Sequence, residues 1–173
     1  VEYIENDPEA CAYTGDTYTY TEGSTTYRAS CTKDDVATAE KMAYPRGTLM
    51  PRAVEYYERH LRTVPVSGSL QFDRRCRYTI GGEPCCESHP SQCQYDATNM
   101  CHEAPIGASS YADADFVLFV TARPTQGSTV AWATTCRSDQ YGRPIAGHAN
   151  FGPNRISTAA LQLNELAAVA THE

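Results

Sequence analysis

The sequence predicts an α+β fold in which a sheet packs against a helix. Three segments rich in apolar and β-branched residues, 116–120, 129–136 and 145–151, follow one another with turn residues between them. Segment 156–173 then places apolar residues at helical spacing and contains no Gly or Pro. Three strands followed by a long apolar helix are typical of a layered α+β domain, with the helix packed under the sheet.

Composition indicates one folded domain spanning residues 1–173. A hydrophobic share of 41% with 20% charged residues is enough for one core. The net charge of −7, without any basic run, excludes a nucleic-acid backbone as an expected partner. No apolar stretch reaches the roughly 18 residues of a membrane span, so no transmembrane segment is expected in this chain. The first residue is not Met, which indicates a processed or engineered terminus.

The first thirty residues are expected to contain a hairpin closed by a disulfide. After a short extended opening at residues 3–4, Asp and Pro at 7–8 turn the chain. Thr and Tyr alternate through residues 14–27 around two glycines, which is typical of two strands joined by a turn. A disulfide between Cys11 and Cys31 would close this excursion.

A helical region interrupted by prolines is expected next. Residues 32–35 carry acidic side chains that suit a first helical turn, so we expect a helix to start there and to run past Met42. Pro45 and Pro51 then predict a break or a kink. A second helical piece follows and ends before Pro65.

Eight cysteines, an even number, indicate an oxidising compartment in which paired thiols persist. A short strand is predicted at 70–72, and residues 74–101 then form a loop that is too long to be ordered without cross-links. Because a disulfide between neighbours strains the peptide, Cys85 and Cys86 are expected to bond different partners. Sequence alone does not decide how the loop cysteines pair; they include Cys76, Cys85, Cys86 and Cys93.

The alternative for this loop is a zinc site that uses its cysteines together with His89 and His102. The spacings lack the C-x2-C pairs that structural zinc prefers, so disulfides are favoured. Of the other histidines, His60 is interpreted as solvated, as is His89. His148 lies in the predicted strand 145–151, and this setting indicates a surface or cleft residue to which no role is assigned.

The end of the predicted C-terminal helix carries the strongest indication of chemistry. Ser157 is a suitable N-cap, and the apolar stripe stops on His172-Glu173. A His-Glu pair on a helix begins the metal site of zinc peptidases, in which a second His follows one turn later. The pair by itself is weak evidence, since His102-Glu103 repeats it inside the cysteine-rich loop and a terminal His is more often solvated.

Four short segments, taken in order, match the pattern of a known peptidase family. They are DFVLFV at 115–120, AWATTC at 131–136, Asn150 with Pro153 and Ile156, and VATHE at 169–173. Together they resemble the leishmanolysin-like zinc metalloendopeptidases of the metzincin group, and the resemblance covers nearly the whole chain. The most specific part is AWATTC followed at this distance by THE.

The resemblance implies that residues 1–173 are the N-terminal catalytic subdomain of such an enzyme. This subdomain has a twisted mixed sheet, a backing helix and an active-site helix that begins near Ser157. His172 would be the first zinc ligand, and Glu173 the general base that takes a proton from the attacking water. Zinc would need further His ligands beyond residue 173, supplied by a missing C-terminal half or a partner chain, and the substrate would be a peptide or protein.

The resemblance also implies a role for the strand 129–136. An extended peptide substrate would pair along its outer edge. The residues concerned are Thr129, Val130, Ala131, Trp132, Ala133 and Thr134. Ordinary sheet packing explains the strand equally well. The resemblance further favours the disulfides Cys11–Cys31 and Cys101–Cys136, and it marks the cysteine-rich loop 74–101 as an insertion.

Two functions stay open at this point. The first is a secreted or cell-surface zinc endopeptidase that cleaves peptide bonds with a metal-activated water. Residues 1–173 by themselves are expected to be inactive. The second is a catalytically inactive, secreted structural or adhesive module that retains the peptidase fold. The even cysteine count supports an extracellular location in both cases.

Overall fold

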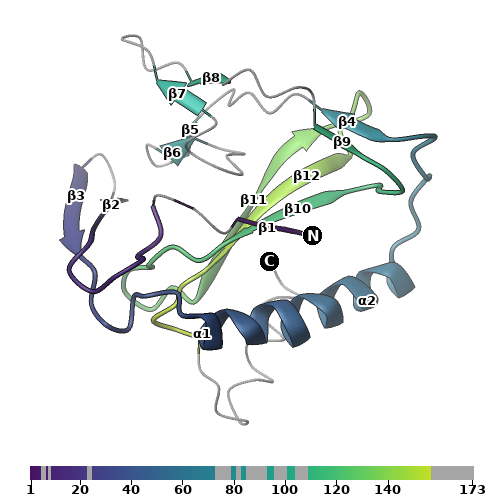
Figure 1. Cartoon of the computed structure of the whole chain (residues 1–173). Helices are drawn as coiled ribbons and strands as arrows, with labels where there is room; N and C mark the ends of the chain where they lie inside the picture. The colour runs from purple at the N-terminus through teal and green to yellow at the C-terminus, as the bar shows by residue number, and fades with distance from the viewer. Residues whose placement is uncertain are drawn as a thin grey trace.

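The computed structural model describes residues 1–4, 7, 9–22, 25–72, 79–80, 83–84, 93–95, 101–103 and 109–156. These residues form a mixed four-stranded sheet, a long helical segment along one face of that sheet, and four two-stranded sheets (Figure 1). The predicted α+β class is confirmed.

The central sheet has the strand order β1-β10-β12-β11. Strands β1 (Glu2–Tyr3), β10 (Val117–Thr121) and β12 (Pro144–Phe151) run parallel, whereas β11 (Ala131–Ser138) pairs antiparallel with β12. The mixed character is therefore as expected. Residues 145–151 of β12 are all buried, because this strand lies inside the sheet and both of its faces are covered.

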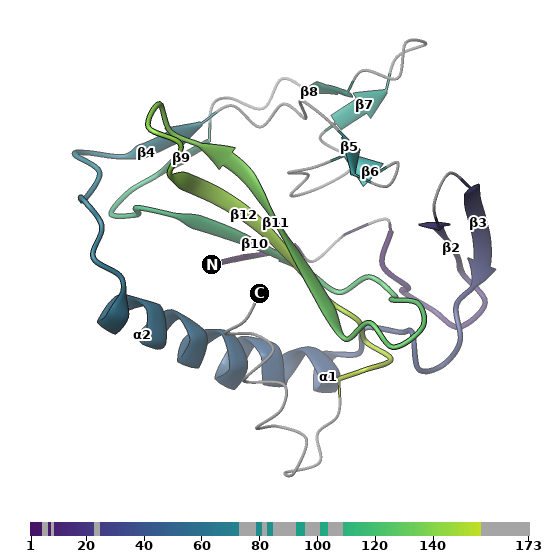
Figure 2. The ribbon, with the colours of Figure 1, turned by 180° about the vertical axis from the view of Figure 1, so that it is seen from behind.

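One continuous helical segment covers one face of the sheet (Figures 1 and 2). It consists of α1 (Ala39–Tyr44), the π-helical turn η1 (Pro45–Leu49) and α2 (Met50–His60). Its apolar side chains form one core with the sheet; the buried members are Leu49, Met50, Ala53, Val120, Ala149 and Phe151. This packing makes the segment the backing helix of the sheet.

The predicted break between the two helical pieces is a π-helical turn and not an interruption. Pro45 opens η1 and Pro51 lies in the first turn of α2; neither has an N–H to donate to the preceding turn, and the helix between them is π-helical. The N–H of Met50 bonds to the carbonyl of Pro45, so the chain continues without unwinding. The segment ends at His60, before Pro65 as expected.

The helix starts later than the sequence predicts. The Asp35 carboxylate accepts bonds from the N–H (2.9 Å) and hydroxyl (2.6 Å) of Thr32 and so closes a local turn. The helix begins only after Thr38, whose hydroxyl accepts a bond from the N–H of Lys41. The predicted start at residues 32–35 was wrong because the acidic side chain satisfies the backbone of a turn and not that of a helix.

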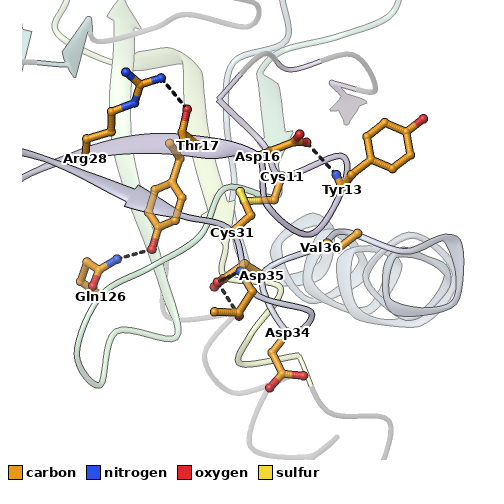
Figure 3. Close-up of a disulfide and its surroundings, with 12 residues drawn as sticks. Cys11, Tyr13, Asp16, Thr17, Arg28, Cys31, Asp34, Asp35, Val36 and Gln126 are labelled. Atoms are coloured by element: carbon orange, nitrogen blue, oxygen red, sulfur yellow. Dashed lines mark hydrogen bonds between the residues drawn. A yellow bond between two sulfur atoms is a disulfide. The ribbon is translucent and has the colours of Figure 1, made fainter.

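The disulfide-closed hairpin is confirmed. Strands β2 (Thr17–Glu22) and β3 (Thr25–Ser30) pair antiparallel, and Cys11 and Cys31 are bonded with their Cα atoms 5.9 Å apart. Figure 3 shows this disulfide beside Val36, which forms a β-bridge with Cys11. The side chain of Gln126 donates a hydrogen bond of 2.5 Å to the hydroxyl of Tyr18. The hairpin is thereby tied to the loop that precedes β11.

Smaller strand pairs lie on the side of the sheet away from α2. Strand β4 (Leu70–Phe72), at its predicted place, pairs with β9 (Ser109–Tyr111). Leu70 joins a second buried cluster with Val117, Phe119, Ile145 and Ala146. Inside the cysteine-rich segment the described strands are β5 (Thr79–Ile80), β6 (Glu83–Pro84), β7 (Cys93–Tyr95) and β8 (Cys101–Glu103).

Several expectations fall outside the described residues. They concern the C-terminal helix from Ser157 with His172 and Glu173, the solvated His89, and the pairing of Cys76, Cys85 and Cys86. Cys93, Cys101 and Cys136 are described by their backbone only, so the pair Cys101–Cys136 also stays a prediction. Within the described ranges, no helix is long and apolar enough to cross a membrane.

Gly152, directly after β12, lies where the chain approaches the loop before β11. A Cβ atom at this position would be 2.2 Å from Thr125 Oγ1 and 2.9 Å from Asn154 Oδ1. The two side chains are held in place: Thr125 donates to the carbonyl of Thr129 at 2.6 Å, and Asn154 donates to the carbonyl of Thr125 at 3.2 Å. Only glycine fits this position without a shift of the loop.

We therefore expect Gly152→Ala to destabilise the protein by about 1–3 kcal/mol, the usual cost of overpacking. Urea denaturation of the wild type and the variant measures the difference. Gly47→Ala is the matched control, because a Cβ there meets no atom within 4 Å and alanine is the better helix former. Equal losses of stability in the two variants would contradict the close approach at Gly152.

Candidate functional site

The hydrogen-bond register of β11 shows which of its backbone groups face outward. Ala131 lies opposite Phe151, and the N–H of Gly152 donates to the carbonyl of Val130 at 3.0 Å. Val130 and Gly152 flank the pair Ala131 and Phe151. In an antiparallel ladder, a hydrogen bond between the flanking residues means that the pair between them is non-hydrogen-bonded. Ala131 therefore directs its own N–H and C=O away from β12.

The same alternation continues along the strand. Trp132 and Thr134 lie opposite Asn150 and His148, and their backbone N–H and C=O groups form hydrogen bonds with β12. Ala133, like Ala131, points its N–H and C=O outward. Strand β11 is the last of the central sheet, and in the part of the chain that the structure describes no strand pairs with its outer edge. Two N–H and two C=O groups are thus oriented toward an additional strand.

Two of the predicted edge residues lie outside the strand. Thr129 precedes β11 in the loop, where its N–H donates to the carbonyl of Gln126 and its carbonyl accepts from Thr125. Val130 bonds to Gly152 through its carbonyl. Thr129 is thus held within the loop, whereas Val130 is bonded to the residue that follows β12.

A buried polar cluster lies behind this strand. His148, at 2% exposure, has its Nε2 atom 2.8 Å from the Thr121 hydroxyl, which itself donates to Asn150 Oδ1 at 2.9 Å. Since the hydroxyl proton is used in that bond, Nε2 of His148 carries a proton and donates. Burial, with a smaller contribution from the positive charge of Arg123, lowers the pKa of His148 to about 3. The imidazole is therefore neutral at physiological pH.

The interpretation of His148 as a surface or cleft residue was wrong. It sits on the interior strand β12, and both faces of that strand are covered. In contrast, His60 is exposed as expected and stacks on Tyr56.

Asn150 and Arg123 extend the cluster to the N-terminal segment. The Asn150 side chain accepts from the N–H of Arg123 at 2.7 Å and donates to its carbonyl at 3.0 Å. The Arg123 guanidinium, also buried, pairs with Asp7 at 2.6 Å and with Glu9. The end of β10 is thus held both to β12 and to residues near the N-terminus.

Trp132 connects the polar cluster to the outer strand. Its ring packs edge-to-face on the His148 ring, with centroids 4.9 Å apart and an interplanar angle of 71°. The indole is half-buried. A buried neutral histidine therefore supports an aromatic side chain next to the outward-facing groups of Ala131 and Ala133.

Among the described residues, no group of three or more His, Cys, Asp or Glu side chains is arranged to hold a metal ion. The predicted metal ligand His172 and the predicted base Glu173 lie outside those residues. Four of the six predicted edge residues, Ala131 to Thr134, lie in β11. Their role and the metal-binding part of the site stay predictions.

The family model of leishmanolysin, peptidase family M8, matches residues 1–173, the whole of this sequence. The chain belongs to the leishmanolysin family. Among its relatives, a leishmanolysin-like peptidase of Drosophila melanogaster is 32% identical over 78% of this chain and 24% of its own length. A leishmanolysin of Leishmania tropica is 26% identical over 83% of this chain and 19% of its own length.

A third relative, a leishmanolysin-like peptidase of Caenorhabditis elegans, is 26% identical over 79% of the chain and 25% of its own length. The leishmanolysin-family chain thus spans about a fifth to a quarter of the length of the relatives it matches.

Sequence reasoning missed the cluster of Thr121, Arg123 and Asn150 in this leishmanolysin-family chain. One signal was present: His148 and Asn150 alternate with apolar residues in β12, a strand that is otherwise apolar. Alternation of this kind places both polar side chains on one face. What it does not reveal is the partner segment, which supplies Thr121 at the end of β10 and Arg123 just after it, 27 to 29 positions earlier in the chain.

The neutral state of His148 makes stability depend on pH. In the unfolded chain an ordinary His takes a proton below about pH 6.5, whereas folded His148 does so only near pH 3. The contribution of His148 to the free energy of unfolding should therefore be constant above about pH 6.5. It should fall toward pH 3, by up to about 1.4 kcal/mol per pH unit. His148→Gln, which keeps an N–H near the Nε2 position, should lose this contribution.

Urea denaturation at several pH values between 7 and 4 measures the effect as the stability difference between wild type and His148→Gln. This difference should shrink as the pH falls, since only the wild type is penalised. The exposed His60→Gln serves as the control and should follow the wild type. A wild-type advantage over His148→Gln that is the same at pH 7 and pH 4 would disprove the neutral buried state.

Proposed function

We propose that this chain is the N-terminal part of a zinc-dependent endopeptidase. The observation that carries the proposal is the match to the leishmanolysin family over residues 1–173. An outer strand with backbone groups directed away from its neighbour supports it, because extended peptides bind proteins by adding a strand to such an edge.

The proposed reaction needs residues that lie outside the described part of the chain. His172 offers an imidazole, the nitrogen ligand that zinc accepts, and Glu173 follows it directly. One imidazole cannot hold catalytic zinc, and no second His is available beside it in this sequence. We propose that the remaining ligands come from a further part of the protein; the chain spans about a quarter of the length of the Drosophila melanogaster relative it matches.

In this proposal each residue of the pair has one task. His172 would contribute one ligand to a zinc ion, which when bound would supply a polarised water. Glu173 would act as the general base, with a carboxylate that can take a proton from the attacking water and return it to the leaving amine of the peptide. If residues 157–173 form the expected helix, a carboxylate directly after the ligand would be placed for this task, as in His-Glu peptidase motifs.

The substrate backbone would pair with Ala131 and Ala133. Each offers an N–H and a C=O toward the outer side, so three consecutive residues of an extended peptide span both positions. Trp132 and Thr134 are unavailable for this purpose because their groups bond to β12. Binding through the backbone orients a peptide without selecting its sequence.

We further propose that the protein works outside the cytosol, secreted or at the cell surface. The Cys11–Cys31 disulfide and the even number of cysteines support this location, since such bonds persist in oxidising compartments.

Replacing the proposed base tests the chemistry. In the full-length protein, Glu173→Gln should lower kcat for peptide cleavage by about 10²–10⁴-fold while zinc content stays at the wild-type level. His172→Ala should lower both zinc content and activity. The matched control is Glu103→Gln, in the second His-Glu pair of the chain, which should change neither. A wild-type protein without zinc and without cleavage would instead support the inactive structural or adhesive module.

Removing one outward N–H tests the strand. Ala133→Pro deletes a donor that does not bond to β12, and proline is tolerated on the outer side of an edge strand. We expect kcat/KM to fall about 10-fold, the equivalent of one hydrogen bond, with little change in the melting temperature. Ala133→Ser keeps the N–H and is the control. An unchanged kcat/KM in Ala133→Pro would place the substrate elsewhere.

A further inference from the structure

Trp132 can contact an added strand through its side chain only. It is the only Trp of the sequence, and it stands between two alanines. Its backbone groups bond to β12, so toward an added strand it presents a side chain alone. The indole is half-buried, which leaves part of its surface open.

The side of the sheet on which the indole lies follows from alternation. Ala131 and Ala133 pack against the cluster that α2 forms with the sheet. Trp132, between them, points to the opposite face, where it contacts His148. A peptide residue directly opposite Trp132 would point to that same face, and cross-strand neighbours on one face touch.

His148 determines where the indole sits. It is buried, it donates to Thr121, and that hydroxyl is bonded in turn to Asn150. If the imidazole shifted, its hydrogen bond to the Thr121 hydroxyl would break. The bond is buried, so water would not replace it. The edge-to-face contact with Trp132 therefore fixes an apolar surface next to the outer edge of β11.

We propose that Trp132 is a specificity-determining residue, and that His148 is the positioning residue behind it. The indole forms one wall of a subsite for the peptide residue that pairs opposite it. This subsite takes large apolar or aromatic side chains and discriminates against small polar or acidic ones. The inference rests on the proposed peptidase function and adds the side-chain preference that backbone pairing cannot supply.

The test uses the full-length protein and peptides that differ at one position, Leu against Ser, moved in turn along the substrate. At one position the wild type should prefer Leu by at least about 10-fold in kcat/KM, the scale of apolar pockets. Trp132→Ala should abolish this preference there and leave the other positions unchanged. Trp132→Phe, which restores an aromatic wall, should recover most of it.

His148→Gln separates positioning from folding. Glutamine can keep the donor to Thr121 but lacks the ring that packs against the indole. The Leu-over-Ser ratio of kcat/KM should fall to between those of wild type and Trp132→Ala. Calorimetric binding of the two peptides to Glu173→Gln, alone and combined with Trp132→Ala, measures the same preference without turnover.

The outcomes separate the two proposals. If Trp132→Ala lowers kcat/KM for Leu and Ser peptides by one common factor, Trp132 supports only the strand, and the subsite is disproved while the peptidase function stands. If the wild type neither cleaves nor binds peptides at any position, the peptidase function fails and the subsite with it. A preference that His148→Gln leaves at the wild-type value overturns the positioning role alone.

Discussion

The hydrogen bonds of the Asn150 side chain hold the parts of this molecule together. The amide is fully buried, and burial of such a group is unfavourable unless its donor and acceptor are both bonded. Here it accepts from the Thr121 hydroxyl and the Arg123 N–H, and it donates to the Arg123 carbonyl. The end of β10 is thereby locked to β12, and the guanidinium of Arg123 adds Asp7 and Glu9 of the N-terminal segment.

The two faces of the outer strand β11 are held by different interactions. On one face the helical segment packs its leucine, methionine and alanine side chains against Phe151 and Ala149, and Ala133 joins this core. On the other face a polar cluster ends at the contact between His148 and Trp132. Small side chains on the first face and one large ring on the second give the outer edge two distinct sides. No strand among the described residues pairs with this edge, and most proteins avoid an open edge unless it serves binding.

The histidines of this leishmanolysin-family chain illustrate how environment decides role. His148 is neutral at physiological pH, as a metal ligand must be, yet its Nε2 proton is bonded to Thr121 inside a closed network. It is therefore a structural residue. His60 is exposed on α2 and stacks on Tyr56. His172, the proposed ligand, differs from both in the sequence, because a carboxylate follows it directly.

Sequence by itself determined the local features of this protein. Apolar runs, turn residues and cysteine spacing predicted β4, β10, β11 and β12, the closed hairpin with Cys11–Cys31, and the α+β class, because each depends on residues close in the chain. Only the tertiary structure decided the burial of His148, its contact with Trp132, and which groups of β11 face outward. These depend on strand order and register, since a slip by one residue would reverse every side chain of the strand. Order and register bring together residues far apart in the chain, such as Thr121 and His148.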